Sequence, residues 1–210
     1  GQSAHKFSTD IRLLQSFGEL EEPFSKDQVG SSAMAYKRNP INSERVTSLS
    51  RYLISLLDNA AFTHANQWLE RSLDDSANRR LSLPEAFLTA NAILNVCLYI
   101  VRGLNVNRGG INRRIRQELP FMVTETILME AVKTGGDRQQ LHKAIRDHSM
   151  AALTAMKQGQ PNDLIARIRK DPFFSRITRK IDAIMKPENH TGLSARQVEM
   201  FVKETNRIVK

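Results

Sequence analysis

Apolar residues recur at helical spacing along almost the whole chain, and no segment shows the convincing alternation of a β-strand. Leu49, Leu53, Leu56 and Leu57 form one such stripe. Side chains three or four residues apart share one face of an α-helix, whereas strand residues alternate with a period of two. The sequence therefore predicts an all-α fold class, in which part of a long-helix bundle is followed by a smaller C-terminal helical domain.

Helix-starting and helix-ending residues divide this pattern into segments. Gly18 is expected to end the first helix, and Asn42 or Ser43 to cap the second. Asp74 or Asp75 is expected to cap a third helix that is kinked or restarted at Pro84. Shorter helices are expected at 111–117, from Pro120 to the Gly135-Gly136 pair, from the cap Asp137 to 157, and at 162–170, 175–185 and 191–209.

The turn-like stretch 105–110 separates two expected domains. Residues 1–106 would be the C-terminal part of a central helical-bundle domain, with a long loop at about 19–40. Residues 107–210 would be a C-terminal all-helical domain. Because the chain opens without Met and directly as a running helix, it looks like the C-terminal part of a longer protein.

The charge balance leaves two classes of function open. The chain carries 31 Lys and Arg against 22 Asp and Glu, a formal charge of +9. Such a charge suits a nucleic-acid or membrane-surface binder, or an enzyme for an anionic metabolite. The basic residues are scattered, and three tyrosines and one tryptophan offer few stacking platforms for bases. The balance therefore favours the enzyme, with no specific nucleic acid as a partner.

Two further features bear on location. The longest apolar run, 86–101, is interrupted by Thr89, Asn91 and Asn95, so no membrane partner is expected. The single cysteine, Cys97, cannot form an internal disulfide, which fits a reducing compartment and predicts a cytoplasmic protein.

The loop Gly30–Pro40 is the most informative segment, with the sequence GSSAMAYKRNP. Its small residues allow a backbone to approach a ligand closely, and Lys37, Asn39 and nearby helix N-terminal amides could bind a carboxylate or phosphate. On composition alone, a flexible surface linker is an equal alternative, because long loops divide between function and disorder.

The same loop resembles the signature of the fumarase/aspartase superfamily, Gly-Ser-Ser-x-Met-Pro-x-Lys-x-Asn-Pro, and departs from it only at Ala35, which replaces the usual Pro. Within that superfamily the chain is most similar to the adenylosuccinate lyase family. The segments that carry this resemblance are 9–14 (TDIRLL), 68–80 (WLERSLDDSANRR), 114–122 (RIRQELPFM) and 162–168 (NDLIARI).

The resemblance implies a carbon-nitrogen lyase of purine and AMP biosynthesis that works without a cofactor. Such an enzyme eliminates fumarate from adenylosuccinate, giving AMP, and from succinylated aminoimidazole carboxamide ribotide (SAICAR), giving the carboxamide ribotide AICAR. It also implies a homotetramer whose active sites are shared between subunits. Another lyase of the superfamily, such as an argininosuccinate lyase, and a non-catalytic helical assembly or nucleic-acid-binding module remain the alternatives.

The resemblance also implies roles for single residues of the loop. Ser31 would be the general base, which needs an alkoxide stabilised by loop amides and the cation of Lys37. Lys37 and Asn39 would face the developing charge on the substrate carboxylate. Ser32 and Arg45 would add substrate contacts, although backbone support is the plainer role for Ser32.

Arg71, Ser76 and Arg80 look like a clamp for the nucleotide phosphate. Ser76 and Arg80 are four residues apart and so share a helix face, near a helix N-terminus where anions are favoured. Arginine suits phosphate through its bidentate fork. The five histidines show neither metal-ligand spacing nor the family's general-acid motif, so no metal is expected and the chain alone is expected to be inert.

Overall fold

The computed structural model describes residues 1–25, 34 and 36–209. The chain divides into two compact units, Gly1–Ile111 and Asn112–Lys210. The described residues form nine α-helices and two strands of two residues each. The all-α class expected from the sequence is therefore confirmed, with the longer helices in the first unit. The assignment of residues 1–106 and 107–210 to two functional domains stays a prediction.

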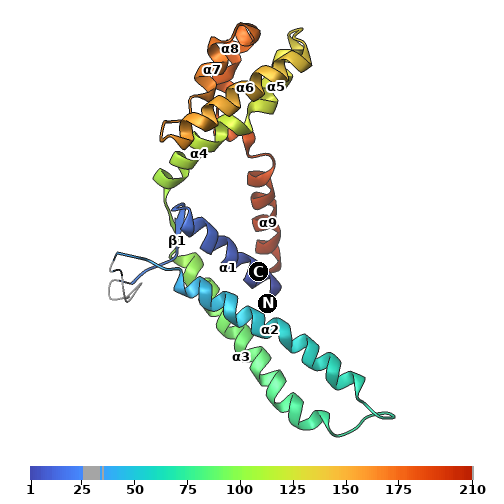
Figure 1. The fold of residues 1–210 in the computed structure, drawn as a ribbon. Helices are drawn as coiled ribbons and strands as arrows, with labels where there is room; N and C mark the ends of the chain where they lie inside the picture. Colours follow the sequence, from blue (N-terminus) through green and yellow to red (C-terminus); the bar gives the residue numbers. More distant parts are fainter. Residues whose placement is uncertain (26–33, 35, 210) are drawn as a thin grey trace. The chain divides into compact units, whose positions relative to one another are not determined.

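Three helices make up most of the first unit (Figure 1): α1 (Gln2–Ser16), α2 (Ile41–Ala65) and α3 (Asp75–Arg102). α1 packs against α2, and α2 and α3 form a long antiparallel hairpin. The apolar stripes of the three helices meet in one small core built on Ile11, Val46, Ile93 and Ile100. This core lies towards the end of the hairpin where α2 begins.

A short ribbon holds that end of the first unit together. β1 (Leu20–Glu21), which follows α1, pairs antiparallel with β2 (Asn105–Val106), which follows α3. Gly18 has a φ of +70°, a left-handed conformation that favours glycine, and it follows the end of α1 as expected. A side chain at Gly110 would overlap the carbonyl of Gly18, so the close approach also requires glycine there.

The second unit is a bundle of short elements joined to the first by α4 (Arg108–Met122). Its elements are α5 (Thr124–Lys133), α6 (Arg138–Lys157), α7 (Leu164–Lys170), the 3₁₀ turn η1 (Pro172–Ile177), α8 (Thr178–Ile184), the 3₁₀ turn η2 (Pro187–His190) and α9 (Ser194–Ile208). Their core includes the fully buried Ile127, Leu141, Phe174 and Ile181.

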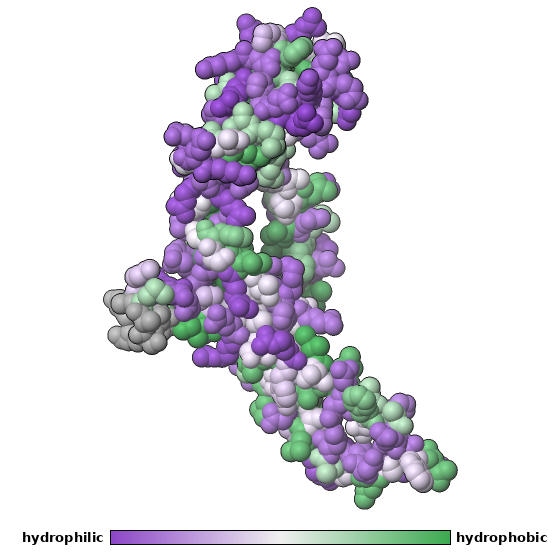
Figure 2. Space-filling view, in the orientation of Figure 1, coloured by the Kyte–Doolittle hydropathy of each residue, from purple (hydrophilic) through white to green (hydrophobic). Residues whose placement is uncertain are grey.

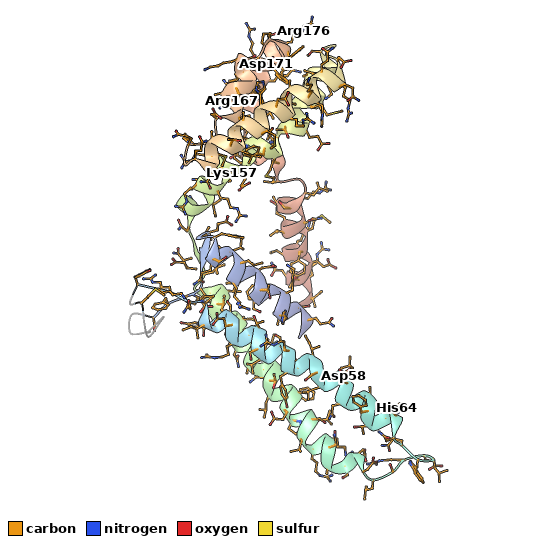
Figure 3. All side chains as sticks on the ribbon, viewed as in Figure 1. Asp58, His64, Lys157, Arg167, Asp171 and Arg176 are labelled. Atoms are coloured by element: carbon orange, nitrogen blue, oxygen red, sulfur yellow. The ribbon has the colours of Figure 1, made fainter. Side chains whose placement is uncertain are left out.

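Polar contacts fix the ends of several of these elements (Figure 3). Asp137 accepts a hydrogen bond from the amide of Gln140 at 2.8 Å, which confirms the cap expected for α6. Asp171 caps η1 by accepting from the amide of Phe173 at 2.9 Å, and its other oxygen lies 2.7 Å from Nε2 of His148. The carboxylate of Asp171 thus connects α6 to the start of η1.

Several helix boundaries differ from those expected. Pro84 lies inside the continuous helix α3, and Pro120 lies inside the last turn of α4. The helix start expected at Pro120 and the restart considered for Pro84 are wrong, because the loss of one amide donor interrupts only one hydrogen bond while the flanking turns continue. The kink that was the other expectation for Pro84 stays a prediction. α2 begins one or two residues before the expected caps, at Ile41, after a proline that has no side-chain acceptor.

Few residues of α3 are buried against the rest of the chain. Only Thr89, Ile93 and Ile100 of this helix are buried. Apolar side chains are exposed along the α2–α3 hairpin (Figure 2), among them Leu57, Phe62, Leu81, Phe87, Leu88 and Leu94. By length and composition alone, α3 is also apolar enough to cross a membrane, although polar residues interrupt its apolar run. A single helix of this kind is weak evidence for a membrane span, because core helices of other proteins pass the same test. An exposed apolar surface of this extent is typical of an interaction site.

One ion-pair cluster in the second unit makes its stability depend on pH. Hydrogen bonds from the ammonium groups of Lys133 and Lys180 lower the pKa of Glu130 from 4.5 to about 2. A depressed carboxyl pKa stabilises the fold at pH values above 4.5, and the contribution is lost as the pH falls from 4.5 towards 2. We expect Glu130→Gln to make the thermal midpoint fall less steeply over this range.

Circular dichroism melts of both proteins between pH 7 and pH 2, about one pH unit apart, would measure this difference. Glu125→Gln, on the same helix, is the matched control, because Glu125 is exposed and no ion pair to it is seen among the described residues. Parallel profiles for the wild type and Glu130→Gln would contradict the prediction.

Candidate functional site

A cavity of about 520 Å³ lies where the long loop returns to the helices. It is lined by Lys37 and Asn39 of the loop, by Arg12 on α1, and by Glu44 in the first turn of α2. The structure therefore brings together the two loop residues expected to bind a carboxylate. Ser31, Ser32 and Ala35 lie outside the described residues, so their roles stay predictions.

Two cations of this cavity come from different elements. Lys37 is exposed, and Arg12 is half-buried on α1. Arg38 also lines the cavity, but its guanidinium contacts Glu21 at 3.4 Å. Lys37, Arg12 and the amide of Asn39 therefore offer an anion two further charges and several donors, beside the carboxylate of Glu44. Arg45, one residue beyond Glu44, is exposed in the same turn of α2 but does not line the cavity.

Arg12 was missed as a site candidate. It lies three residues after Thr9, which also lines the cavity, so the two share a face of α1. Both belong to the segment TDIRLL, one of those that carry the resemblance to the family. Their position beside the loop depends on the packing of α1 against α2, which the local sequence does not encode.

The residues of the expected phosphate clamp lie in the turn between α2 and α3 and in the first turns of α3. As the four-residue spacing implies, Arg80 contacts Ser76: its guanidinium donates to the Ser76 carbonyl at 2.8 Å and also meets the hydroxyl. Arg71 and Arg80 are both exposed. Arg71 donates to Asp75 Oδ1 at 3.1 Å.

A second cavity of about 360 Å³ lies beside Arg71. Arg79 and His64 also line it, whereas Ser76 and Arg80 do not. Of the three clamp residues, Arg71 alone therefore faces this cavity. Arg79 shares with Arg71 a contact to the carboxylate of Asp75.

Asp74 occupies the N-cap position of α3, but its side chain makes no capping hydrogen bond. Its carboxylate instead accepts hydrogen bonds from Ser72 and Gln67, and these lower the pKa of Asp74, the contact with Ser72 most strongly. The expectation of an aspartate cap is thus right in position and wrong in contact. The carboxylate organises the turn before α3.

The two groups of candidate residues lie at opposite ends of α2. Lys37, Asn39 and Arg45 lie at its first turn, and Arg71 follows its last turn. α2 has 25 residues, so the two ends are separated by roughly 37 Å. Figure 3 shows Asp58 and His64 on the half of α2 that is remote from the loop. No single small substrate can span this distance.

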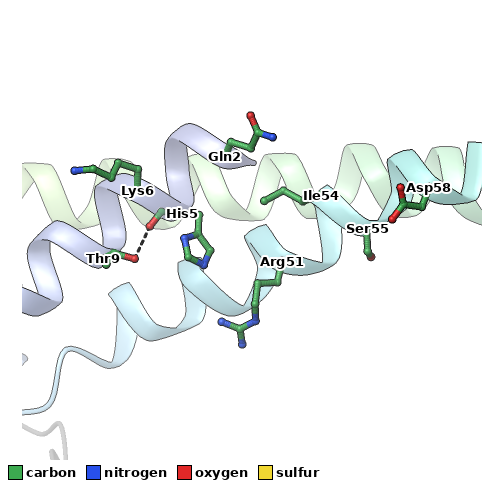
Figure 4. Close-up of a pocket in the computed structure, with 8 residues that line it drawn as sticks. All are labelled: Gln2, His5, Lys6, Thr9, Arg51, Ile54, Ser55 and Asp58. Atoms are coloured by element: carbon green, nitrogen blue, oxygen red, sulfur yellow. Dashed lines mark hydrogen bonds between the residues drawn. The ribbon is translucent and has the colours of Figure 1, made fainter. Parts of the chain in front are cut away.

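A third cavity, of about 540 Å³, lies in the groove between α1 and α2 (Figure 4). Lys6 and Arg51 give it a cationic lining, His5 also lines it, and Asp58 lies at its far end. None of the residues expected to bind substrate lines it. Among the described residues, no three His, Cys, Asp or Glu side chains gather as metal ligands would. Burial raises the pKa of the Cys97 thiol, which makes it a poor nucleophile.

Two family descriptions match the chain. Residues 120–201 match "Adenylosuccinate lyase C-terminus", and residues 2–54 match "Lyase". The chain is 51% identical to adenylosuccinate lyase of Saccharomyces cerevisiae over an alignment of 203 residues. This alignment covers 96% of this chain and 42% of the yeast protein. Adenylosuccinate lyase of Schizosaccharomyces pombe is 45% identical over 205 residues, covering 97% and 42%. The chain thus spans less than half the length of these relatives.

Solved structures share the fold. A 3-carboxy-cis,cis-muconate lactonizing enzyme from Pseudomonas putida superimposes with a TM-score of 0.81 at 23% identity, covering 99% of this chain and 46% of that one. A fumarate lyase from Mesorhizobium sp. BNC1 gives a TM-score of 0.74 at 18% identity, covering 94% and 43%. At these identities the likeness supports the helical-bundle fold alone.

Proposed function

Because this chain belongs to the adenylosuccinate lyase family of the fumarase/aspartase superfamily, we propose that it forms part of an enzyme that eliminates fumarate from adenylosuccinate and from SAICAR. The observation that carries the proposal is the 51% identity to a yeast adenylosuccinate lyase across 96% of the chain. The basic cavity with Lys37 and Asn39 supports it, because both substrates carry a succinyl group with two carboxylates.

The proposed reaction is a β-elimination. The general base Ser31 takes the proton from the carbon next to a substrate carboxylate, and the electron pair left behind forms the double bond of fumarate as the C–N bond breaks. An acid protonates the departing nitrogen of AMP or AICAR. Lys37 and Asn39 stabilise the charge that develops on the carboxylate, with contacts from Ser32 and Arg45. Residues outside this sequence supply the acid.

We assign Arg71, Ser76 and Arg80 to the nucleotide phosphate. In support, two exposed guanidinium groups and a hydroxyl lie in a short segment at the start of α3. A superfamily lyase for argininosuccinate would have no phosphate to bind there. A helical module without catalysis would need neither the phosphate clamp nor the carboxylate-binding residues of the loop. A functional phosphate clamp would therefore favour adenylosuccinate lyase over both alternatives.

We further infer a homotetramer in which each active site combines residues of several chains. The separation of the two candidate groups by the length of α2 supports this assembly. So does the apolar surface exposed on the α2–α3 hairpin, which would be buried against helices of other chains. We place the enzyme in the cytoplasm, where a purine biosynthetic lyase would meet its substrates.

A substrate panel tests the proposal. We expect the full-length protein to release fumarate from adenylosuccinate and SAICAR but not from argininosuccinate, measured by the ultraviolet absorbance of fumarate. Residues 1–210 alone should release none, because neither the acid nor the complete set of ligands is present. Release from argininosuccinate only would move the activity to another lyase of the superfamily. Steep salt-dependent retention on DNA or RNA, without turnover, would favour the non-catalytic module.

A further inference from the structure

The carboxylate of Glu22 is buried just before the signature loop. Only 3% of this residue is exposed. Its Oε1 accepts hydrogen bonds from the backbone amide of Asn42 at 2.8 Å and from the Asn42 side chain at 3.2 Å. Its Oε2 accepts from the amide and the hydroxyl of Ser43, both at 2.9 Å. Four donors from two successive residues of α2 therefore converge on one side chain.

The start of α2 explains why this contact is needed. The helix begins at Ile41, and its N-cap is Pro40, which has no side-chain oxygen. The second and third amides of a helix, here those of Asn42 and Ser43, normally receive the oxygen of a Ser, Thr, Asp or Asn cap. Glu22 supplies both acceptors from twenty positions earlier in the chain. The negative charge is also favoured at a helix N-terminus.

A second side chain connects the same two segments. Gln15, on α1, accepts a hydrogen bond from the backbone amide of Glu22 at 3.1 Å through its Oε1. Through its Nε2 it donates to the backbone carbonyl of Arg38 at 3.0 Å. The segment before the signature loop is thus linked to the chain at Arg38, between Lys37 and Asn39, and again at Asn42 and Ser43, just after them.

We propose that Glu22 is a positioning residue for substrate binding. Its carboxylate joins the segment before the loop to the first turn of α2, and thereby fixes Lys37, Asn39 and Arg45 where they meet the substrate carboxylates. The identity of the bound substrate rests on the proposed function. The claim that Glu22 holds the start of α2 in place does not depend on that function. Glu22 touches no substrate itself and acts through these neighbours.

The test compares Glu22→Gln with Glu21→Gln in the full-length protein. The glutamine keeps the shape of Glu22, but its amide group points two N–H donors at one of the two donor pairs on α2. The adjacent Glu21 is a matched control, because within the described part of the chain its carboxylate contacts Arg38 at the surface, at 3.4 Å, and no amide of α2. We expect hydrogen exchange at Asn42 or Ser43 to become about tenfold faster in Glu22→Gln only.

Steady-state kinetics distinguish a positioning role of Glu22 from a mere loss of folded protein in the variant. A structural defect alone would lower kcat in proportion to the folded fraction and leave KM unchanged. We expect Glu22→Gln, assayed with adenylosuccinate well below its melting temperature, to raise KM about tenfold. An unchanged KM, or unchanged exchange at both amides, would overturn the inference. If the wild type releases no fumarate, the proposed function fails, and the exchange experiment still decides whether Glu22 holds the start of α2.

A second variant covers the case in which Glu22→Gln does not fold. Gln15→Ala removes the link between the amide of Glu22 and the carbonyl of Arg38, shortens one side chain that lines the cavity, and leaves the capping carboxylate in place. We expect this variant to melt close to the wild type and to raise KM about threefold. A wild-type KM in a folded Gln15→Ala protein would show that the link through Gln15 takes no part in positioning. Glu22→Asp, which keeps the charge but withdraws the carboxylate from the amides of Asn42 and Ser43, would then decide, because an unchanged KM in that variant would overturn the inference.

Discussion

Replacing Ser31 by alanine is expected to lower kcat for fumarate release by about 10³-fold, with little change in KM. The proton on the carbon next to the carboxylate is weakly acidic, so elimination is slow without a positioned base. The hydroxyl touches the substrate only where that proton is removed, and therefore contributes to the transition state more than to binding. Steady-state rates with adenylosuccinate and with SAICAR in the full-length enzyme would measure the loss.

The neighbouring serine provides the control for this variant. Ser32→Ala makes the same chemical change one residue further along the loop, and we expect a kcat reduced by no more than about tenfold. More than a tenth of the wild-type kcat in Ser31→Ala would mean that the base is another group. A larger loss in Ser32→Ala than in Ser31→Ala would exchange the roles of the two serines.

The second large effect is a recovery of activity on mixing two defective proteins. Ser31→Ala lacks the base, and the double variant Arg71→Ala, Arg80→Ala lacks the phosphate contacts, so each alone should be nearly inactive. The two sets of residues are separated by roughly 37 Å along the 25-residue helix α2. If one active site takes them from different chains, a mixed oligomer contains some sites with both sets intact.

Random mixing in equal amounts gives each site a probability of about one quarter of receiving both intact sets, so we expect about a quarter of the wild-type activity. Fumarate release before and after co-refolding of the two proteins would measure it. Mixing Ser31→Ala with Lys37→Ala is the control, because both residues belong to the same loop and no site can be intact. Failure of the first mixture to recover activity would mean that one chain supplies both sets.

Local chemistry explains what was predictable from the sequence. The helical spacing of apolar residues determined the all-α class, and Gly18 and Asp137 marked helix ends correctly because their effects depend on the adjacent backbone alone. The loop Gly30–Pro40 and the segment 68–80 carried enough family-specific residues to indicate the family. These features need no knowledge of which helices pack together.

The tertiary structure decided how those residues are distributed in space. Pro120 looks like a helix start in the sequence and Pro84 like a kink or a restart, yet both lie within continuous helices, because the turns around them continue. The oxygen atoms that cap α2 come from Glu22, twenty residues before Asn42 in the sequence. Pro40, which occupies the N-cap position, has no side-chain acceptor. The sequence predicted a helix between Lys37 and Arg71, but only the structure showed that it continues unbroken to Ala65 and leaves the two residues beyond its opposite ends. Contacts between residues distant in sequence depend on how the helices pack, and local residue patterns do not determine that packing.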